Sequence, residues 1–238
     1  MTSTSRYEAP YHWWGPGPAP PATLHLRDLV QQGTIDLELA TTLWAALGTR
    51  QSLTVIGGPS GLGKSTLLHA LLPSLPSDTH CLYLRGCYET FAFLDDPHFT
   101  PSRSALLVNE LSPHLPIYLW GKAVGRTLAA GKAGYQILAT AHGQSVVDFL
   151  ASLTGSPLRL PAQALAAIGL VALVEPVPGG GGRRVTGLWQ LSEAPSGVSF
   201  DQLEPGDPPG GLSPERFAEA RAALIAFLRH DAPRPSTE

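Results

Sequence analysis

The chain has 238 residues, a net charge of −3 and 43% hydrophobic residues, enough sequence for one or two packed domains. It contains no run of eighteen apolar residues and no apolar signal core near its start, so we expect neither membrane insertion nor secretion, and a cytoplasmic location. Because no block of basic residues occurs, nothing in the composition indicates nucleic-acid binding.

Residues 1–23 contain five prolines between positions 10 and 21, which argue against a helix or a central strand there. We expect an extended tail or linker. Trp13 and Trp14 are unusual in a free tail, so they favour docking on this subunit or on a neighbouring one. A partly disordered tail is the alternative.

Apolar residues at helical spacing predict a short helix over residues 24–33 and a longer one over residues 35–48, capped by Thr34. Between Leu53 and Leu68 an apolar strand then leads through a glycine-rich loop into a helix. The loop has the pattern G-x-x-x-x-G-K-S, which in this context is a phosphate-binding P-loop. The predicted nucleotide-binding residues are Gly58, Pro59, Ser60, Gly61, Leu62, Gly63, Lys64, Ser65 and Thr66.

The residue types in this loop fit the binding of ATP and Mg²⁺. Glycines let backbone N–H groups approach phosphate oxygens, and the following helix directs its N-terminal N–H groups and its dipole at the same anion. Lys64 would contact the β- and γ-phosphates, and the Ser65 hydroxyl would be a Mg²⁺ ligand. A glycine-rich turn with a solvated lysine is the alternative.

Strands and helices alternate after the P-loop, which predicts an α/β fold with a mostly parallel sheet. The expected strands cover residues 80–85, 89–93, 104–108 and 135–139, and the expected helices cover residues 64–72, 116–130, 145–153 and 161–168. A strand pair around a glycine-rich turn follows at residues 170–174 and 184–191, and Pro214 begins a last helix. We therefore expect three parts: a tail (1–23), a P-loop ATPase domain (24–200), and a linker, helix and tail (201–238).

Polar side chains follow three of the predicted strands. In open α/β sheets ligands bind beyond the carboxyl ends of the strands, so we expect Glu89, Glu110 and His142 to converge on the γ-phosphate. Glu110 would orient or deprotonate the attacking water or hold Mg²⁺ through water; a glutamate favoured by a helix dipole is the alternative. His142 would hydrogen-bond the γ-phosphate; a structural histidine is the alternative. Glu89 would be a second acidic residue that competes for the metal role.

Three arginines are candidates for contacts with the γ-phosphate: Arg103, Arg183 and Arg184. Many P-loop NTPases need an arginine that stabilises the transition-state charge, and a neighbouring molecule often supplies it. Surface ion pairs that contribute little to stability are the alternative. We expect at least one of the three to act in hydrolysis.

Several segments resemble the ATPase core of the type II and type IV secretion and pilus ATPases, most closely the tight-adherence pilus branch. LRDLVQQGTIDLELATTLWAAL is similar to the family's lead-in to its P-loop, SRSALLVNEL to its Walker B segment and LAAGKAGYQILATAHGQS to its histidine box. ALAAIGLVALVEPV and GRRVTGLWQL resemble its closing β segment. The resemblance covers residues 24–191.

The resemblance implies a RecA-like core that binds ATP between the subunits of a homo-oligomer, usually a hexamer. The strand pair and the last helix predicted above would add a C-terminal β hairpin and a terminal helix to this core. Such ATPases drive secretion or pilus machinery at the inner face of the inner membrane. Carried onto this chain, Glu110 is the catalytic glutamate, His142 the histidine-box residue and Glu89 the acidic-box residue. Arg103 falls where the family places an arginine near Walker B.

The sequence also departs from the family. Only the proline-rich tail stands where the family has a full N-terminal domain, Asn109 replaces the usual glycine before Glu110, and Leu111 and Ser112 replace the usual residues after it. We therefore weigh a slowly hydrolysing, self-assembling ATPase against a hydrolysis-poor regulatory or scaffold protein gated by nucleotide. A small-molecule kinase is a third hypothesis, disfavoured because no arginine-rich lid segment occurs.

Overall fold

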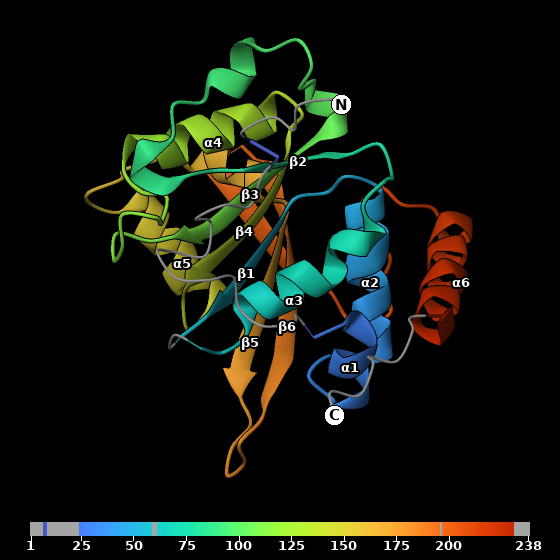
Figure 1. Ribbon diagram of the computed structural model, residues 1–238. Helices are drawn as coiled ribbons and strands as arrows, with labels where there is room; N and C mark the ends of the chain where they lie inside the picture. The colour runs from blue at the N-terminus through green and yellow to red at the C-terminus, as the bar shows by residue number, and fades with distance from the viewer. Residues whose placement is uncertain (1–6, 9–23, 59–60, 196, 231–238) are drawn as a thin grey trace, which may run out of the picture.

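The computed structural model describes residues 7–8, 24–58, 61–195 and 197–230, and in this part of the chain seven strands form one sheet in the order β2-β3-β4-β1-β5-β6-β7. The parallel strands are β1 (Leu53–Gly57), β2 (His80–Tyr83), β3 (Ser104–Leu111), β4 (Gln136–His142) and β5 (Leu170–Pro176). The antiparallel strands are β6 (Arg183–Ala194) and β7 (Gly197–Gln202). The mostly parallel sheet with flanking helices confirms the predicted α/β fold class (Figure 1).

Helices cover both faces of this sheet. One face carries α1 (Leu26–Gln31), α2 (Leu37–Gly48) and α3 (Lys64–Leu71), and the other carries α4 (Lys122–Lys132), α5 (Val146–Thr154) and the 3₁₀ helix Ala162–Ile168. Because successive strand residues point to opposite faces, Val55 of β1 packs under the first group and Ile56 under the second. None of the described helices is long and apolar enough to cross a membrane.

The last helix, α6 (Pro214–His230), packs against the outer side of α2. Leu224 is fully buried in the cluster that includes α2, and the rings of Trp44 and Phe227 lie 4.8 Å apart. Arg221 adds an ion pair with Glu38 at 2.7 Å. The sequence predicted the start of this helix correctly. It did not predict β7, which pairs with β6 and runs past residue 200, the expected end of the ATPase domain.

The strand predicted at residues 89–93 is wrong. The segment forms two 3₁₀ turns, Gly86–Tyr88 and Ala92–Asp95, and Phe91 between them has a left-handed φ of 58°. The Glu89 carboxylate accepts hydrogen bonds from the backbone N–H groups of Arg85 at 3.0 Å and Phe91 at 2.6 Å. Local side-chain bonds of this kind compete with a strand ladder, and the apolar alternation of the sequence does not reveal them.

The helix predicted over residues 116–130 begins only at Lys122. The preceding turn is held by tertiary contacts instead: Pro116 accepts a hydrogen bond from the N–H of Cys87 at 2.9 Å, and Leu119 donates one to the carbonyl of Glu110 at 2.8 Å. Gly121, with a φ of +68°, then allows the chain to turn into the helix. Backbone contacts with β3 therefore override the helical spacing of this segment.

The N-terminal tail is described at two residues, and Trp13 and Trp14 lie outside the described part. The Tyr7 carbonyl accepts a hydrogen bond from the N–H of Tyr83 in β2 at 2.8 Å, and the Tyr7 ring is buried edge-on against Phe93 at 5.3 Å. The Tyr7 hydroxyl donates to Glu89 at 3.0 Å. At this point the tail docks on its own subunit, along the edge strand of the sheet.

Candidate nucleotide site

The strand order brings several candidate residues together at the carboxyl ends of neighbouring strands. β1 lies beside β4, and Gly57 at the end of β1 is in register with His142 at the end of β4. β3, which carries Glu110, is the next strand along. The carboxyl ends of these three strands therefore meet where the P-loop leaves β1, as expected for an open α/β sheet.

The P-loop has the backbone that its glycines predict, although Pro59 and Ser60 lie outside the described residues. Gly61 and Gly63 have left-handed φ angles of +85° and +79°, a conformation that glycine adopts without strain. The first backbone bond of α3 runs from Leu67 N–H to the Gly63 carbonyl at 2.9 Å. The N–H groups of residues 64–66 consequently point out of the helix end, where they can bind an anion.

Lys64 is a buried cation at the start of α3. Its side chain is only 5% exposed, and its Nζ lies 3.6 Å from Oε2 of Glu110, whose side chain is 9% exposed. Charges that are buried to this extent need a partner of opposite sign. The P-loop lysine and the carboxylate predicted at the end of β3 thus form one buried ion pair.

A bulge positions Glu110. The register between β3 and β4 shifts between Val108 and Leu111, and such irregularities re-aim side chains at strand ends. The Thr140 hydroxyl donates to the Asn109 carbonyl inside this shift, and Leu119 holds the backbone of Glu110 from the other side. Neighbours on two segments therefore hold the backbone on which the Glu110 side chain stands.

His142 completes the cluster. Its Nδ1 lies 2.8 Å from the carbonyl oxygen of Gly58, and since a carbonyl only accepts, Nδ1 must carry the hydrogen. Its Nε2 lies 2.9 Å from Oε1 of Glu110, a close polar contact in which Oε1 receives no aligned hydrogen bond from a described residue. His142 therefore links the P-loop backbone to the carboxylate.

Two neighbours of this cluster were missed in the sequence. The ring of His114 packs edge-on against His142 with centroids 5.0 Å apart, and burial together with the negative charge of Glu110 raises the pKa of Tyr118. Ligand atoms of Glu110, His114 and His142 all lie within 4.8 Å of one another, so the three could hold a metal ion. The only sequence signal was a histidine four residues after Glu110.

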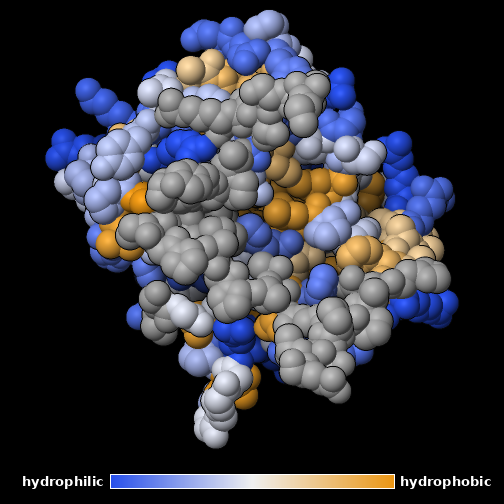
Figure 2. Space-filling view, viewed as in Figure 1, coloured by the Kyte–Doolittle hydropathy of each residue, from blue (hydrophilic) through white to orange (hydrophobic). Residues whose placement is uncertain are grey.

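Arg183, at the start of β6, lies on the P-loop. Its Nη1 is 3.3 Å from the Gly61 carbonyl, and a Cβ atom at Gly63 would stand 2.8 Å from its guanidinium group. The neighbouring Arg184 is exposed and lies opposite Glu175 in the pairing of β5 with β6. The β5–β6 hairpin projects beyond the body of the molecule and ends in nearly white, glycine-rich atoms (Figures 1 and 2).

A cavity of about 420 Å³ opens beside the P-loop, and it is large enough for a small ligand. Arg183 forms one wall of it. The P-loop, the turn between α1 and α2, and the hairpin supply its other lining residues, which are Gln32, Gly33, Thr34, Gly61, Leu62, Val177, Gly181 and Gly182. The cavity is continuous with the phosphate-binding loop through Gly61 and Leu62.

Two predicted residues lie apart from the Lys64–Glu110 pair. Glu89 uses its carboxylate to hold its own loop and the Tyr7 hydroxyl. Arg103 immediately precedes β3, at the opposite end of the strand from Glu110, where it is 55% exposed and pairs with Asp78 at 3.1 Å. Their catalytic roles stay predictions, and Arg103 could meet a nucleotide only on a second subunit.

Comparison with known proteins identifies relatives by structure alone. No protein-family model and no curated protein sequence matches the chain. The chain is similar to the VirB11 ATPase from the Brucella suis type IV secretion system, with 21% identity and a TM-score of 0.48 over 72% of this chain and 64% of that chain. It is also similar to the Legionella pneumophila ATPase DotB, with 14% identity and a TM-score of 0.38 over 76% of this chain and 53% of that chain.

Both neighbours are described as ATPases, and the first belongs to a type IV secretion system. The chain spans less than two thirds of the length of either neighbour.

Proposed function

We propose that the protein is a Mg²⁺-dependent P-loop ATPase in which Glu110 activates the attacking water. One observation carries the proposal: the buried contact between Lys64 and Glu110, 3.6 Å long, at the mouth of the P-loop. A lysine that binds phosphate and a carboxylate that can take a proton must lie within a few ångströms of each other to act on one γ-phosphate. The fold brings them together from α3 and β3.

Binding of ATP would exchange one partner of Lys64 for another. The triphosphate would accept hydrogen bonds from the N–H groups at the start of α3, and the Lys64 ammonium would turn from Glu110 to the phosphate oxygens. Ser65 lies in the first turn of α3, directly after Lys64, so its hydroxyl can serve as a Mg²⁺ ligand. Bound Mg²⁺ would neutralise charge on the β- and γ-phosphates.

Released from Lys64, Glu110 could orient a water molecule toward the γ-phosphate and accept its proton. His142 is well placed to respond to this change, since its two ring nitrogens face Glu110 and the P-loop carbonyl of Gly58. We infer that His142 reports occupation of the site to β4.

The cavity beside the P-loop is the proposed place of the nucleoside. It shares Gly61 and Leu62 with the phosphate-binding loop, and the Gln32 amide offers both a donor and an acceptor to a base. Arg183 stands between the two parts of the site. In this position Arg183 would contact a phosphate or the ribose within the same subunit.

We further propose that hydrolysis needs a second copy of the chain. Arg103 is exposed at the amino end of β3, whereas Glu110 lies near the carboxyl end of the same strand, so Arg103 cannot reach the nucleotide of its own subunit. A ring would bring the far edge of one subunit to the nucleotide of the next, as the family resemblance implies. Service in secretion or pilus machinery follows from the same resemblance.

The test is phosphate release from Mg-ATP over a wide range of protein concentrations, with nucleotide binding measured in parallel. We expect specific activity to rise with concentration and to fall by about 10²- to 10⁴-fold in Glu110→Gln, the usual contribution of a general base. Lys64→Ala should lose nucleotide binding; unchanged binding would refute the site. Tight binding without release at any concentration would refute the ATPase and support a nucleotide-gated scaffold.

A further inference from the structure

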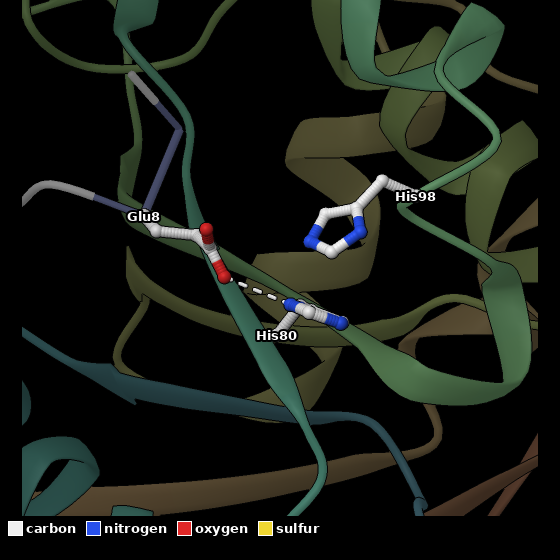
Figure 3. Close-up of side chains that lie close together, drawn as sticks. All are labelled: Glu8, His80 and His98. Atoms are coloured by element: carbon white, nitrogen blue, oxygen red, sulfur yellow. Dashed lines mark hydrogen bonds and ion pairs between the residues drawn. The ribbon is translucent and has the colours of Figure 1, made fainter. Parts of the chain in front are cut away.

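A second group of possible metal ligands lies near the amino ends of β2 and β3, away from the carboxyl ends that form the nucleotide site. It consists of Glu8 in the N-terminal tail, His80 at the start of β2 and His98 in the loop before β3. Oε1 of Glu8 is 2.8 Å from Nδ1 of His80, and ligand atoms of all three residues lie within 4.8 Å of one another. Figure 3 shows the carboxylate and the two imidazole rings facing a common space.

Packing holds each of these side chains in place. Glu8 follows Tyr7, which is anchored by its carbonyl to β2 and by its buried ring to Phe93. The His98 ring lies edge-on to His80, with centroids 4.5 Å apart, and its backbone N–H donates to Asp96 at 2.9 Å. The ligands are therefore preorganised before any ion binds.

The donor set selects the kind of ion. Two imidazole nitrogens with one carboxylate suit Zn²⁺ and other late transition metals, whereas Mg²⁺ and Ca²⁺ prefer oxygen ligands throughout. The side chains of His80 and Glu8 are 19% and 27% exposed, so an ion can enter from solvent and water can fill a fourth position. An ion would replace the hydrogen shared by Glu8 and His80, since metal ligands bind deprotonated.

We propose that Glu8, His80 and His98 form a Zn²⁺ site that fastens the N-terminal tail to the edge of the sheet. The ion joins three segments that are far apart in sequence, which is the geometry of a structural clamp. The proposal is independent of the nucleotide site. It gives the tail a defined attachment at residues 7–8, beside the outer edge of β2.

The test is a Zn²⁺ titration of the full chain at about pH 7.5 against a chromogenic chelator, with Mg²⁺ titrated separately. The variants are His98→Ala, at an exposed position, and Glu8→Gln, which keeps the shape of the side chain. His25→Ala is the matched control, since it removes an exposed histidine that belongs to neither candidate metal group.

We expect affinity to fall at least about tenfold in both test variants, because even outer-shell partners of metal ligands are worth about 10- to 100-fold. Zn²⁺ should raise the unfolding temperature of the parent and of His25→Ala, and should have no such effect on His98→Ala. Circular dichroism without metal would verify that each variant is folded. The proposal is overturned by unchanged affinity in Glu8→Gln and His98→Ala, by loss of binding in His25→Ala, or by equal binding of Mg²⁺.

Discussion

The buried pair of Lys64 and Glu110 should oppose nucleotide binding as well as serve hydrolysis. Before ATP binds, Nζ of Lys64 is 3.6 Å from the carboxylate, and it must move away to reach a phosphate. With an effective dielectric constant of about 20, lengthening this distance to about 6 Å costs about 2 kcal/mol of Coulomb energy. Glu110→Gln removes that cost, so it should tighten ATP binding about 20- to 30-fold while it slows hydrolysis.

The assay is calorimetric titration with a non-hydrolysable ATP analogue and Mg²⁺, which separates binding from turnover. Glu193→Gln is the matched control, since it removes the same charge from an exposed pair with Lys132 and should leave the Kd unchanged. If Glu110→Gln binds the analogue equally well or more weakly than the parent, the ion pair does not compete with the nucleotide. The proposed exchange of partners by Lys64 would then be wrong.

Three further predictions concern stability and the P-loop. Burial lowers the pKa of His69 to about 4, below its unfolded value, so the free energy of unfolding should fall by about 3 kcal/mol as pH drops from about 6.5 to about 4. In urea unfolding, the free energy of unfolding of His69→Gln should depend less on pH than that of the parent. An equal pH dependence in the two proteins would count against the prediction. The Tyr7 hydroxyl donates a hydrogen bond to Glu89 and accepts one from the N–H of Ala92 at 3.0 Å. Tyr7→Phe removes both bonds and should lower the free energy of unfolding by about 1–3 kcal/mol in the same measurement. Gly63→Ala places a Cβ atom at a φ of +79° and against the Arg183 side chain. A left-handed backbone costs a residue with a Cβ about 1–2 kcal/mol, so the ATP affinity measured by titration should drop about tenfold or more. An affinity equal to that of the parent would argue against this loop geometry.

The sequence predicted the parts of the fold that short-range patterns control. The strand before the P-loop, the helix from Lys64 and the helix begun by Ser145 follow from apolar periodicity and capping, and all three were found. The length of β3 was underestimated, because Asn109 and Glu110 are polar yet buried. Their burial depends on partners such as Lys64 and Thr140, which come from other segments.

The candidate site shows the same difference between features that short-range patterns predict and features that depend on contacts between distant segments. A motif of fixed spacing located the P-loop, and the rule for strand ends located Glu110 and His142, which the structure brings into contact. The position of Glu89 obeyed the same rule, but its carboxylate is occupied by nearby backbone N–H groups. No sequence pattern distinguishes a strand-end carboxylate that faces a ligand from one that closes its own loop.

The position of β4 between β1 and β3 has a geometric consequence for how the site could be redesigned. Neighbouring strands are about 4.8 Å apart, so the interposed strand keeps the origins of the P-loop and of Glu110 about 10 Å apart, wide enough for a phosphoryl group and a water molecule between them. β4 acts as a spacer whose thickness is set by backbone hydrogen bonding rather than by side chains. Substitutions along β4 can therefore alter what the site senses through His142 while the width of the reaction gap stays the same.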